Sequence, residues 1–454
     1  MSLAISTAKA DITPPPGTPL AGFGEDSPRL TTGATAPLYA RCVILWDSGW
    51  PNVIVTCDTL AIPRAVNLAL RAQIEPLGPP GTPIGHEDLA ITATHTHNGG
   101  ALTGELDPYI AYNVTPGSAA DGAIQAYTAQ LQASVVGCVQ AALGAPQTPC
   151  TLDYQVTTQN FAYNREALPY TETAVPVLAA RDASTGALLA LLFSYGAHPV
   201  AGGPQTVSDP DYPGAACAWI EAQHPGVFAQ FLLGPAGDQD PNGTSWSLGY
   251  AQSLGQGLGA AVLTAAGSPG RTVSGPIGTA YQDLTIPLDI STTASNLAAV
   301  RADYVVREGN MSLPSWYRRH AQQMIGQIDA KSFARSVNLP VQVWTLQGAT
   351  PLYLALTGGE LVSGYAVYLR GLHGGPQGIW VCGYANEDPA YIPSNELLTS
   401  GGALHYACGW DTDYPGIAGG AMTVYGCLGH FKLPPCSASV DVEQILLNAL
   451  AGML

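Results

Sequence analysis

Charged residues are scarce in this chain of 454 residues, lysine and arginine above all, and long apolar runs are missing. Only 11% of the residues are charged, whereas 46% are hydrophobic. Disordered chains are rich in charge and poor in apolar residues, so this composition excludes a mostly disordered protein and favours a large folded core. No stretch approaches the ~18–20 apolar residues of a transmembrane helix, so we expect no membrane span.

Lysine and arginine together number 16, against 33 aspartates and glutamates, which gives a net charge of −17. Phosphate backbones repel such a protein, so nucleic acid is excluded as a partner. The nine cysteines include no C-x-x-C pair, which excludes a zinc knuckle and a dithiol redox motif. No basic segment followed by an apolar one opens the chain, so no signal peptide is predicted and a cytoplasmic location is favoured. The sequence does not indicate an oligomeric state.

Apolar periodicity predicts many strands and helices that alternate irregularly along the chain. We predict the α/β (α+β) class, with mixed, largely antiparallel twisted sheets flanked by helices in a single domain over residues 1–454. The predicted strands are 4–12, 37–47, 52–57, 89–97, 150–157, 173–181, 187–195, 228–233, 340–347, 351–358 and 378–384. The predicted helices are 64–75, 118–143, a short one after 211–214, 245–266, 293–330 with a break near 309–314, and 439–451.

Two histidines, His95 and His97, are separated by one residue at the end of an apolar-alternating run. In a β-strand, residues i and i+2 point to the same face, so a strand over 89–97 places both imidazoles side by side. Neutral imidazole is the commonest metal ligand, and a pair suits zinc. Because His-x-His alone is a weak pattern, the pair is either half of a metal site or two hydrogen-bonded histidines at a sheet rim.

Other polar side chains also follow apolar strands directly, and active sites of α/β proteins gather at strand ends. A catalytic zinc site needs three protein ligands and an open position, and His95, His198 and Glu360 would supply such a set. Each residue alone has an ordinary alternative, such as a hydrogen-bonded loop histidine or a carboxylate at a helix start. Asp58 is either a cap at the end of its strand or a group that orients a ligand histidine.

Seven short motifs, in one order over nearly the whole chain, resemble the catalytic domain of the neutral/alkaline, non-lysosomal ceramidase family. They begin with an Asp-Ile-Thr-Pro-Pro element and include Thr-His-Thr-His and Asp-Tyr-Pro-Gly segments. The matching positions are 11–15 with 20–24, 94–99, 164–165, 198–199 with 211–214, 237–242, 358–360, and 386 with 391–394.

The resemblance implies a zinc ion held by His95, His198, Glu360 and Tyr391. It also implies that a second group contacts the substrate or takes part in catalysis, namely His97, Arg165, Tyr391 and Tyr406. Three carboxylates are predicted to support these groups from behind: Asp58, Asp211 and Asp238.

This chain departs from the family pattern at three places. Asp240 stands where the family has serine, so a serine nucleophile finds no support in that loop. Asn98 replaces a serine after the histidine pair and is the first position at which to expect a changed substrate. The family's C-terminal immunoglobulin-like domain is expected to be absent.

The activity that the resemblance implies is zinc-dependent hydrolysis of a linear N-acyl amide, as in sphingolipid metabolism, on a small-molecule or lipid-like acyl substrate. A water activated by zinc attacks the carbonyl, His97 transfers the proton, and Tyr391, Tyr406 or Arg165 stabilises the oxyanion. One alternative is a zinc esterase or lactonase acting on a non-lipid substrate. A second is an inactive binding protein of the same fold.

Overall fold

The computed structural model describes residues 3–243, 245–290, 294–399, 424 and 426–454. Its main element is a twelve-stranded sheet with the path β15-β13-β12-β11-β5-β1-β2-β3-β4, from which β7, β8 and β9 branch at β5. The strands are β1 (Leu3–Asp11), β2 (Tyr39–Asp47), β3 (Trp50–Cys57), β4 (Leu89–Ala93), β5 (Thr148–Thr158), β7 (Ala174–Asp182), β8 (Leu188–Tyr195), β9 (Phe228–Leu233), β11 (Arg271–Pro287), β12 (Ser336–Gln347), β13 (Leu352–Thr357) and β15 (Ile379–Cys382).

Two small two-stranded sheets lie outside this path and carry residues of the candidate site. They pair β6 (Ala162–Asn164) with β10 (Gln239–Pro241), and β14 (Glu360–Leu361) with β16 (Tyr391–Ile392). The helices are α1 (Arg64–Ile74), α2 (Pro108–Tyr112), α3 (Ala119–Gly144), α4 (Asp211–Gln223), α5 (Leu248–Ala266), α6 (Ala294–Gly309), α7 (Ser315–Ala330), α8 (Ser363–Leu372), α9 (Asn395–Thr399) and α10 (Val442–Ala451), with short 3₁₀ turns η1 (Glu75–Leu77), η2 (His86–Asp88) and η3 (Gly375–Gln377).

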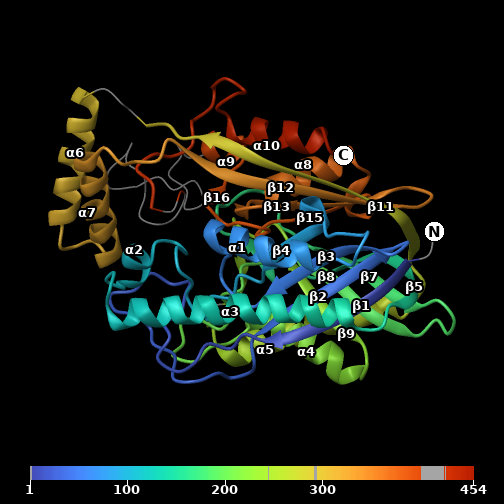
Figure 1. Ribbon diagram of the computed structural model, residues 1–454. Coiled ribbons are helices and arrows are strands. Elements are labelled where there is room, and N and C mark those ends of the chain that lie inside the picture. The colour runs from blue at the N-terminus through green and yellow to red at the C-terminus, as the bar shows by residue number, and fades with distance from the viewer. Residues whose placement is uncertain (1–2, 244, 291–293, 400–423, 425) are drawn as a thin grey trace.

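The sheet bends on itself, so the molecule has four layers in the order helix, sheet, sheet, helix (Figure 1). Side chains of β12, β13 and β15 pack against those of β1, β2, β7 and β8 in one apolar core between the sheet halves. Hydrogen bonds cross this core, because Trp380 Nε1 donates to Ser194 Oγ at 2.7 Å and Tyr154 Oη donates to the Pro376 carbonyl at 2.6 Å. Helices α1, α3, α4 and α5 cover one outer face, and α8 and α10 cover the other.

Helix α3 shows how the sequence pattern produces this packing. Its buried residues include Tyr127, Leu131, Val135 and Val139, which recur every four positions and pack against β1 and β2. At its start, the Ser118 side chain accepts a hydrogen bond from the Asp121 amide and caps the helix. The amphipathic period therefore fixes which side of the helix is buried.

Three strand pairs of the largely antiparallel main sheet are parallel, namely β3 with β4, β8 with β9, and β13 with β15. Parallel neighbours end at the same edge, and ligand sites of α/β proteins form at the carboxyl ends of such strands. The segments that follow these pairs begin at Asp58, Thr94, Gly196, Gly234, Gly358 and Gly383. His95 and His198 lie in these segments, and Glu360 and Tyr391 begin the short strands β14 and β16 that follow two of them.

The predicted fold class is confirmed, and the predicted strands and helices have counterparts within a few residues of their bounds. The strand predicted over 89–97 is wrong at its end, because β4 stops at Ala93. The prediction also missed β11, a strand of 17 residues. Among the described residues, no helix is long and apolar enough to cross a membrane.

Candidate metal centre

The two histidines of the His-x-His segment lie in a loop and not on a strand face. The Thr94 amide makes the last bond of β4 to β3, donating to the Cys57 carbonyl at 2.9 Å, and the His95 amide then donates to the Thr59 carbonyl at 2.9 Å, beyond the ends of both strands. His95 has φ 64°, a left-handed conformation that L-residues adopt rarely, and it turns the chain. The imidazoles still come together, with ring centroids 5.0 Å apart. The predicted proximity is therefore right, although the predicted cause is not.

His95, His198 and Glu360 converge on one point. The Nε2 atoms of the two histidines lie 3.1 Å apart, and Glu360 Oε2 lies 3.4 Å from His95 Nε2 and 3.3 Å from His198 Nε2. Each histidine turns Nδ1 toward a carbonyl oxygen, Leu60 for His95 at 2.7 Å and Ala236 for His198 at 2.9 Å. A carbonyl only accepts, so Nδ1 carries the proton and each Nε2 presents a lone pair.

This arrangement fits a tetrahedral zinc ion. With zinc–ligand distances of about 2.0–2.2 Å, tetrahedral ligand atoms are about 3.3 Å apart, close to the three separations seen between His95, His198 and Glu360. Two imidazole lone pairs this close repel each other unless a cation lies between them. Three side chains that are at most 2% exposed thus form a preshaped ligand set.

The charge state of the group suits a metal. Burial lowers the pKa of His95, which keeps the imidazole neutral at pH 7. Burial alone would raise the pKa of Glu360, but His95 and His198 beside it hold that pKa well below its ordinary value. His95 therefore offers a neutral imidazole and Glu360 an ionised carboxylate, which are the forms that coordinate metal.

His97 differs from the other two histidines. Its ring centroid lies 5.0 Å from that of His95 and 5.2 Å from that of His198. One nitrogen atom from each of the three rings lies within 4.8 Å of the other two. Neither ring nitrogen of His97 has a hydrogen-bond partner in the described parts of the chain, so no carbonyl fixes its tautomer. Burial, followed by the effect of His95 and His198, lowers its pKa well below the ordinary value. His97 is thus a neutral, unanchored imidazole beside the ligand set.

Tyr391 lies next to Glu360 and His198, and Arg165 contacts Tyr391. Strand β14 pairs in parallel with β16 so that Glu360 and Tyr391 are directly opposite. The Tyr391 ring is nearly parallel to the His198 ring, with centroids 6.4 Å apart, and Arg165 Nη2 donates to Tyr391 Oη at 3.1 Å. The structure thus brings Tyr391 and Arg165 to the predicted site. Tyr406 lies outside the described residues.

Two neighbours of the ligand set were not predicted from the sequence. Tyr384 Oη lies 3.5 Å from Glu360 Oε2, and its ring centroid lies 4.5 Å from that of His95. Asp388 Oδ2 lies 3.9 Å from His95 Nδ1, and in the described structure neither Asp388 oxygen has a hydrogen-bond partner. Tyr384 follows β15 by two residues, so the rule that polar groups gather after apolar strands could have found it.

The three carboxylates predicted to support the ligands accept hydrogen bonds from backbone amides of neighbouring segments. Asp238 accepts hydrogen bonds from the Ser363 amide and hydroxyl at 2.8 and 2.7 Å, which ties down the segment after Glu360. Asp58 Oδ2 accepts from the Tyr39 amide at 2.9 Å, and Asp211 Oδ2 accepts from the Gly202 amide at 2.8 Å. Their support of the ligands themselves stays a prediction.

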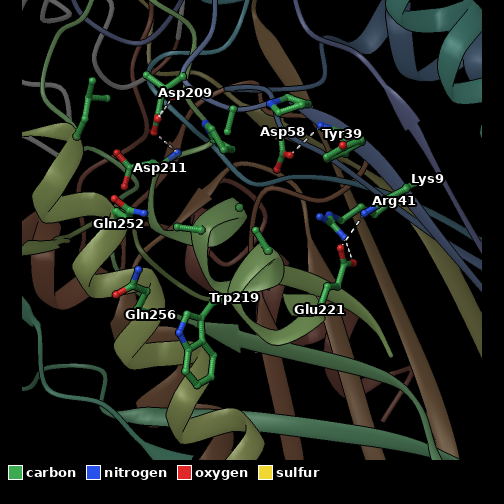
Figure 2. A pocket seen from close by; sticks show the side chains of 18 of the residues that line it. Lys9, Tyr39, Arg41, Asp58, Asp209, Asp211, Trp219, Glu221, Gln252 and Gln256 are labelled. Atoms are coloured by element: carbon green, nitrogen blue, oxygen red, sulfur yellow. Dashed lines mark hydrogen bonds and ion pairs between the residues drawn. The ribbon is translucent and has the colours of Figure 1, made fainter. Parts of the chain in front are cut away.

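Asp58 and Asp211 line a separate cavity of about 570 Å³ between the sheet and helices α4 and α5. Figure 2 shows these carboxylates together with Asp209, while Trp219 and the ion pairs of Glu221 with Arg41 and Lys9 form other parts of the wall. Asp209 also contacts the loop of the candidate metal centre, because its carbonyl accepts a hydrogen bond from Thr96 Oγ1 at 2.6 Å. The acidic wall of this cavity is thus hydrogen-bonded to the loop that carries His95 and His97.

Taken together, a mixed α/β sheet with a buried His-His-Glu group at the ends of its parallel strands defines a candidate metal-dependent enzyme. No family model and no curated protein matches the chain in sequence. Among solved structures, neutral ceramidase from Pseudomonas aeruginosa is similar with a TM-score of 0.64 and 20% identity, covering 89% of this chain and 70% of that chain. A ceramidase complexed with C2 is similar with a TM-score of 0.64 and 18% identity, covering 94% of this chain and 73% of that chain. The chain therefore has the fold of neutral ceramidase, as its motifs predicted.

Proposed function

We propose that this protein is a ceramidase-like, zinc-dependent hydrolase that cleaves the linear amide bond of an N-acyl amine. The observation that carries the proposal is the convergence of His95 Nε2, His198 Nε2 and Glu360 Oε2 at 3.1–3.4 Å. The similarity to neutral ceramidases supports an amide substrate with a lipid-like acyl chain, so ceramide is the first compound to test.

His95, His198 and Glu360 would hold the ion, and Tyr391 is the fourth candidate ligand. A zinc ion bound there supplies a Lewis acid and lowers the pKa of its water. The Leu60 and Ala236 carbonyls fix the ligand tautomers, and Tyr384 orients the Glu360 carboxylate. These contacts hold the site in its binding geometry before the ion enters.

His97 is the proposed proton carrier. Hydrolysis must move a proton from the attacking water to the leaving amine, and an imidazole that is neutral at pH 7 and lies beside the ligand set can accept that proton. His97 lies beside both ligand histidines, and in the described structure it makes no hydrogen bond that would have to break first. Its neutral form can accept the proton of the water and then donate it to the departing nitrogen.

The developing oxyanion needs a donor, and Arg165 and Tyr391 are the candidates. Arg165 remains charged at any relevant pH, and its guanidinium lies against the Tyr391 ring, with Cζ 5.6 Å from the ring centroid. Hydrogen-bond donors aimed at the position where charge develops contribute about 3–4 kcal/mol to such reactions.

A paired panel of N-acyl amides and the matching esters tests the proposal. We expect zinc-dependent amide hydrolysis by the wild type and a loss of at least about 10³-fold in His95→Ala and Glu360→Gln. Turnover of esters or lactones alone would favour the esterase reading, and zinc binding without turnover of any acyl compound would favour a binding protein. Full amide turnover in both variants would contradict the proposal.

A further inference from the structure

Asp240 lies beside the candidate metal centre on a short, well-supported segment. Strands β10 and β6 pair antiparallel with Gln239 opposite Asn164 and Asp240 opposite Tyr163, which brings Asp240 next to Arg165. Asp240 Oδ1 and Arg165 Nη1 are 3.1 Å apart, and the two side chains are only 10% and 14% exposed. This ion pair is therefore largely shielded from solvent.

The other terminal nitrogen of Arg165 connects the ion pair to the site. Arg165 Nη2 donates to the Gly237 carbonyl at 2.7 Å and to Tyr391 Oη at 3.1 Å. A guanidinium is a rigid plane, so anchoring Nη1 at Asp240 and Nη2 at Gly237 fixes where the remaining hydrogen bond points. The direction of the bond to Tyr391 thus depends on Asp240.

The segment that carries Asp240 also makes backbone contacts with two of the candidate metal ligands, His198 and Glu360. The His198 amide donates to the Gln239 carbonyl at 2.8 Å, and His198 Nδ1 faces the Ala236 carbonyl. The Gly237 amide donates to the Leu361 carbonyl, and a Cβ at Gly237 would lie 2.5 Å from the Glu360 carbonyl oxygen. Arg165 is thereby attached to the same framework as His198 and Glu360.

We propose that Asp240 is a positioning residue, which holds Arg165 so that Arg165 fixes the Tyr391 hydroxyl at the metal centre. The inference rests on the proposed function. Asp240 acts through Arg165 and Tyr391 and not on the substrate.

The first test measures zinc affinity by chelator competition in Asp240→Asn and Asp240→Ser. Loss of a support behind a metal site lowers affinity about 10- to 100-fold, and we expect this range together with a lower kcat and an unchanged KM. Asp153→Asn is the matched control, because Asp153 forms a similarly buried 2.9 Å ion pair with Arg181 and lies in strand β5. The control should keep wild-type affinity.

The second test asks whether Asp240 acts through Tyr391. If it does, Asp240→Asn has no further effect in a Tyr391→Phe background, whereas a merely structural role gives additive losses. Additive losses, or Asp240 variants that match Asp153→Asn, overturn this inference and leave the proposed function standing. A wild type that binds no zinc overturns both. If Asp240→Asn does not fold, Asp240→Ser with its smaller side chain is judged by the same criteria.

Discussion

The antiparallel part of the sheet and its three parallel strand pairs have different tasks. The antiparallel strands supply most of the core between the sheet halves, where Leu45, Leu178 and Trp344 are nearly fully buried. The parallel pairs end at the candidate metal centre, and the segments after them supply His95, His198 and Glu360. From this comparison we expect stability and chemistry to rest on separate residues, so that each can be changed without the other.

The largest effect should appear when the two neighbouring histidines after β4 are compared. His95→Gln should lose zinc, whereas His97→Gln should keep it and still lose about 10²–10⁴-fold in kcat, because only the proton carrier is removed. Metal content and kcat of both purified variants check this difference. Equal zinc loss in both variants would mean that His97 is a ligand and that the metal is held by the three histidines His95, His97 and His198.

A substitution in the antiparallel core should lower stability and leave zinc binding and catalysis almost unchanged. Leu45→Ala leaves a cavity in the core between the sheet halves and should lower the free energy of unfolding by about 2–5 kcal/mol. Zinc affinity and kcat of the folded fraction should stay within about twofold of wild type. Denaturant unfolding followed by titration of the refolded protein measures both. A parallel fall in zinc affinity would show that core and site are not separable.

The pH dependence of stability tests the cavity behind the metal side. Burial raises the pKa of Asp58 to about 6 and that of Asp211 to about 7, both from an ordinary value of 3.8. The folded state then binds more protons than the unfolded state between about pH 4 and pH 7, so the free energy of unfolding falls as pH rises through that window. We expect a fall of several kcal/mol from these two groups, because each pKa unit corresponds to about 1.4 kcal/mol. The fall should continue toward pH 8, because burial also raises the pKa of Glu105 to about 8.

Asp58→Asn should remove part of this fall, because the amide oxygen can still accept from the Tyr39 amide but no longer ionises. The difference between the wild-type and variant curves isolates the contribution of Asp58 from all other carboxylates. Two curves of identical slope would mean that Asp58 titrates normally in the folded protein.

The smallest effect concerns Asn98, where the sequence led us to expect a changed substrate. Its Oδ1 accepts from Arg29 Nη1 at 2.8 Å and from the Gln205 amide at 3.1 Å, while Nδ2 donates to the Gly203 carbonyl at 2.9 Å. These contacts use the amide to join loops. Asn98→Ser should therefore lower the free energy of unfolding by about 1–2 kcal/mol and leave the ratio of amide to ester turnover unchanged. A change in that ratio above about fivefold would restore Asn98 as a specificity residue.

Much of this architecture could be predicted from the sequence because it follows local rules. The period of α3 and the apolar runs of β2 and β8 are visible in any short window. Strand β11 was missed because its Gly275-Pro276 step and its many exposed residues hide the alternation of a strand. The end of β4 could not be predicted, since a positive φ at a histidine depends on bonds to residues 36 positions away.

The candidate site was predicted unevenly for the same reason. The motifs brought together His95, His198 and Glu360, which the structure places around one point, and Tyr391, whose ring lies beside that of His198. The contact of Asp388 with His95 joins segments that are far apart in the chain, and no local pattern marks it. Spacing alone also could not tell that Asp58 and Asp211 open onto another cavity.

Zinc content of the purified protein, measured together with removal and readdition of zinc, tests the central claim most directly. The account predicts about one zinc ion per chain, loss of amide hydrolysis on chelation, recovery with zinc, and no stable binding in His95→Ala. Purified protein with no bound metal and turnover that survives chelation would contradict it.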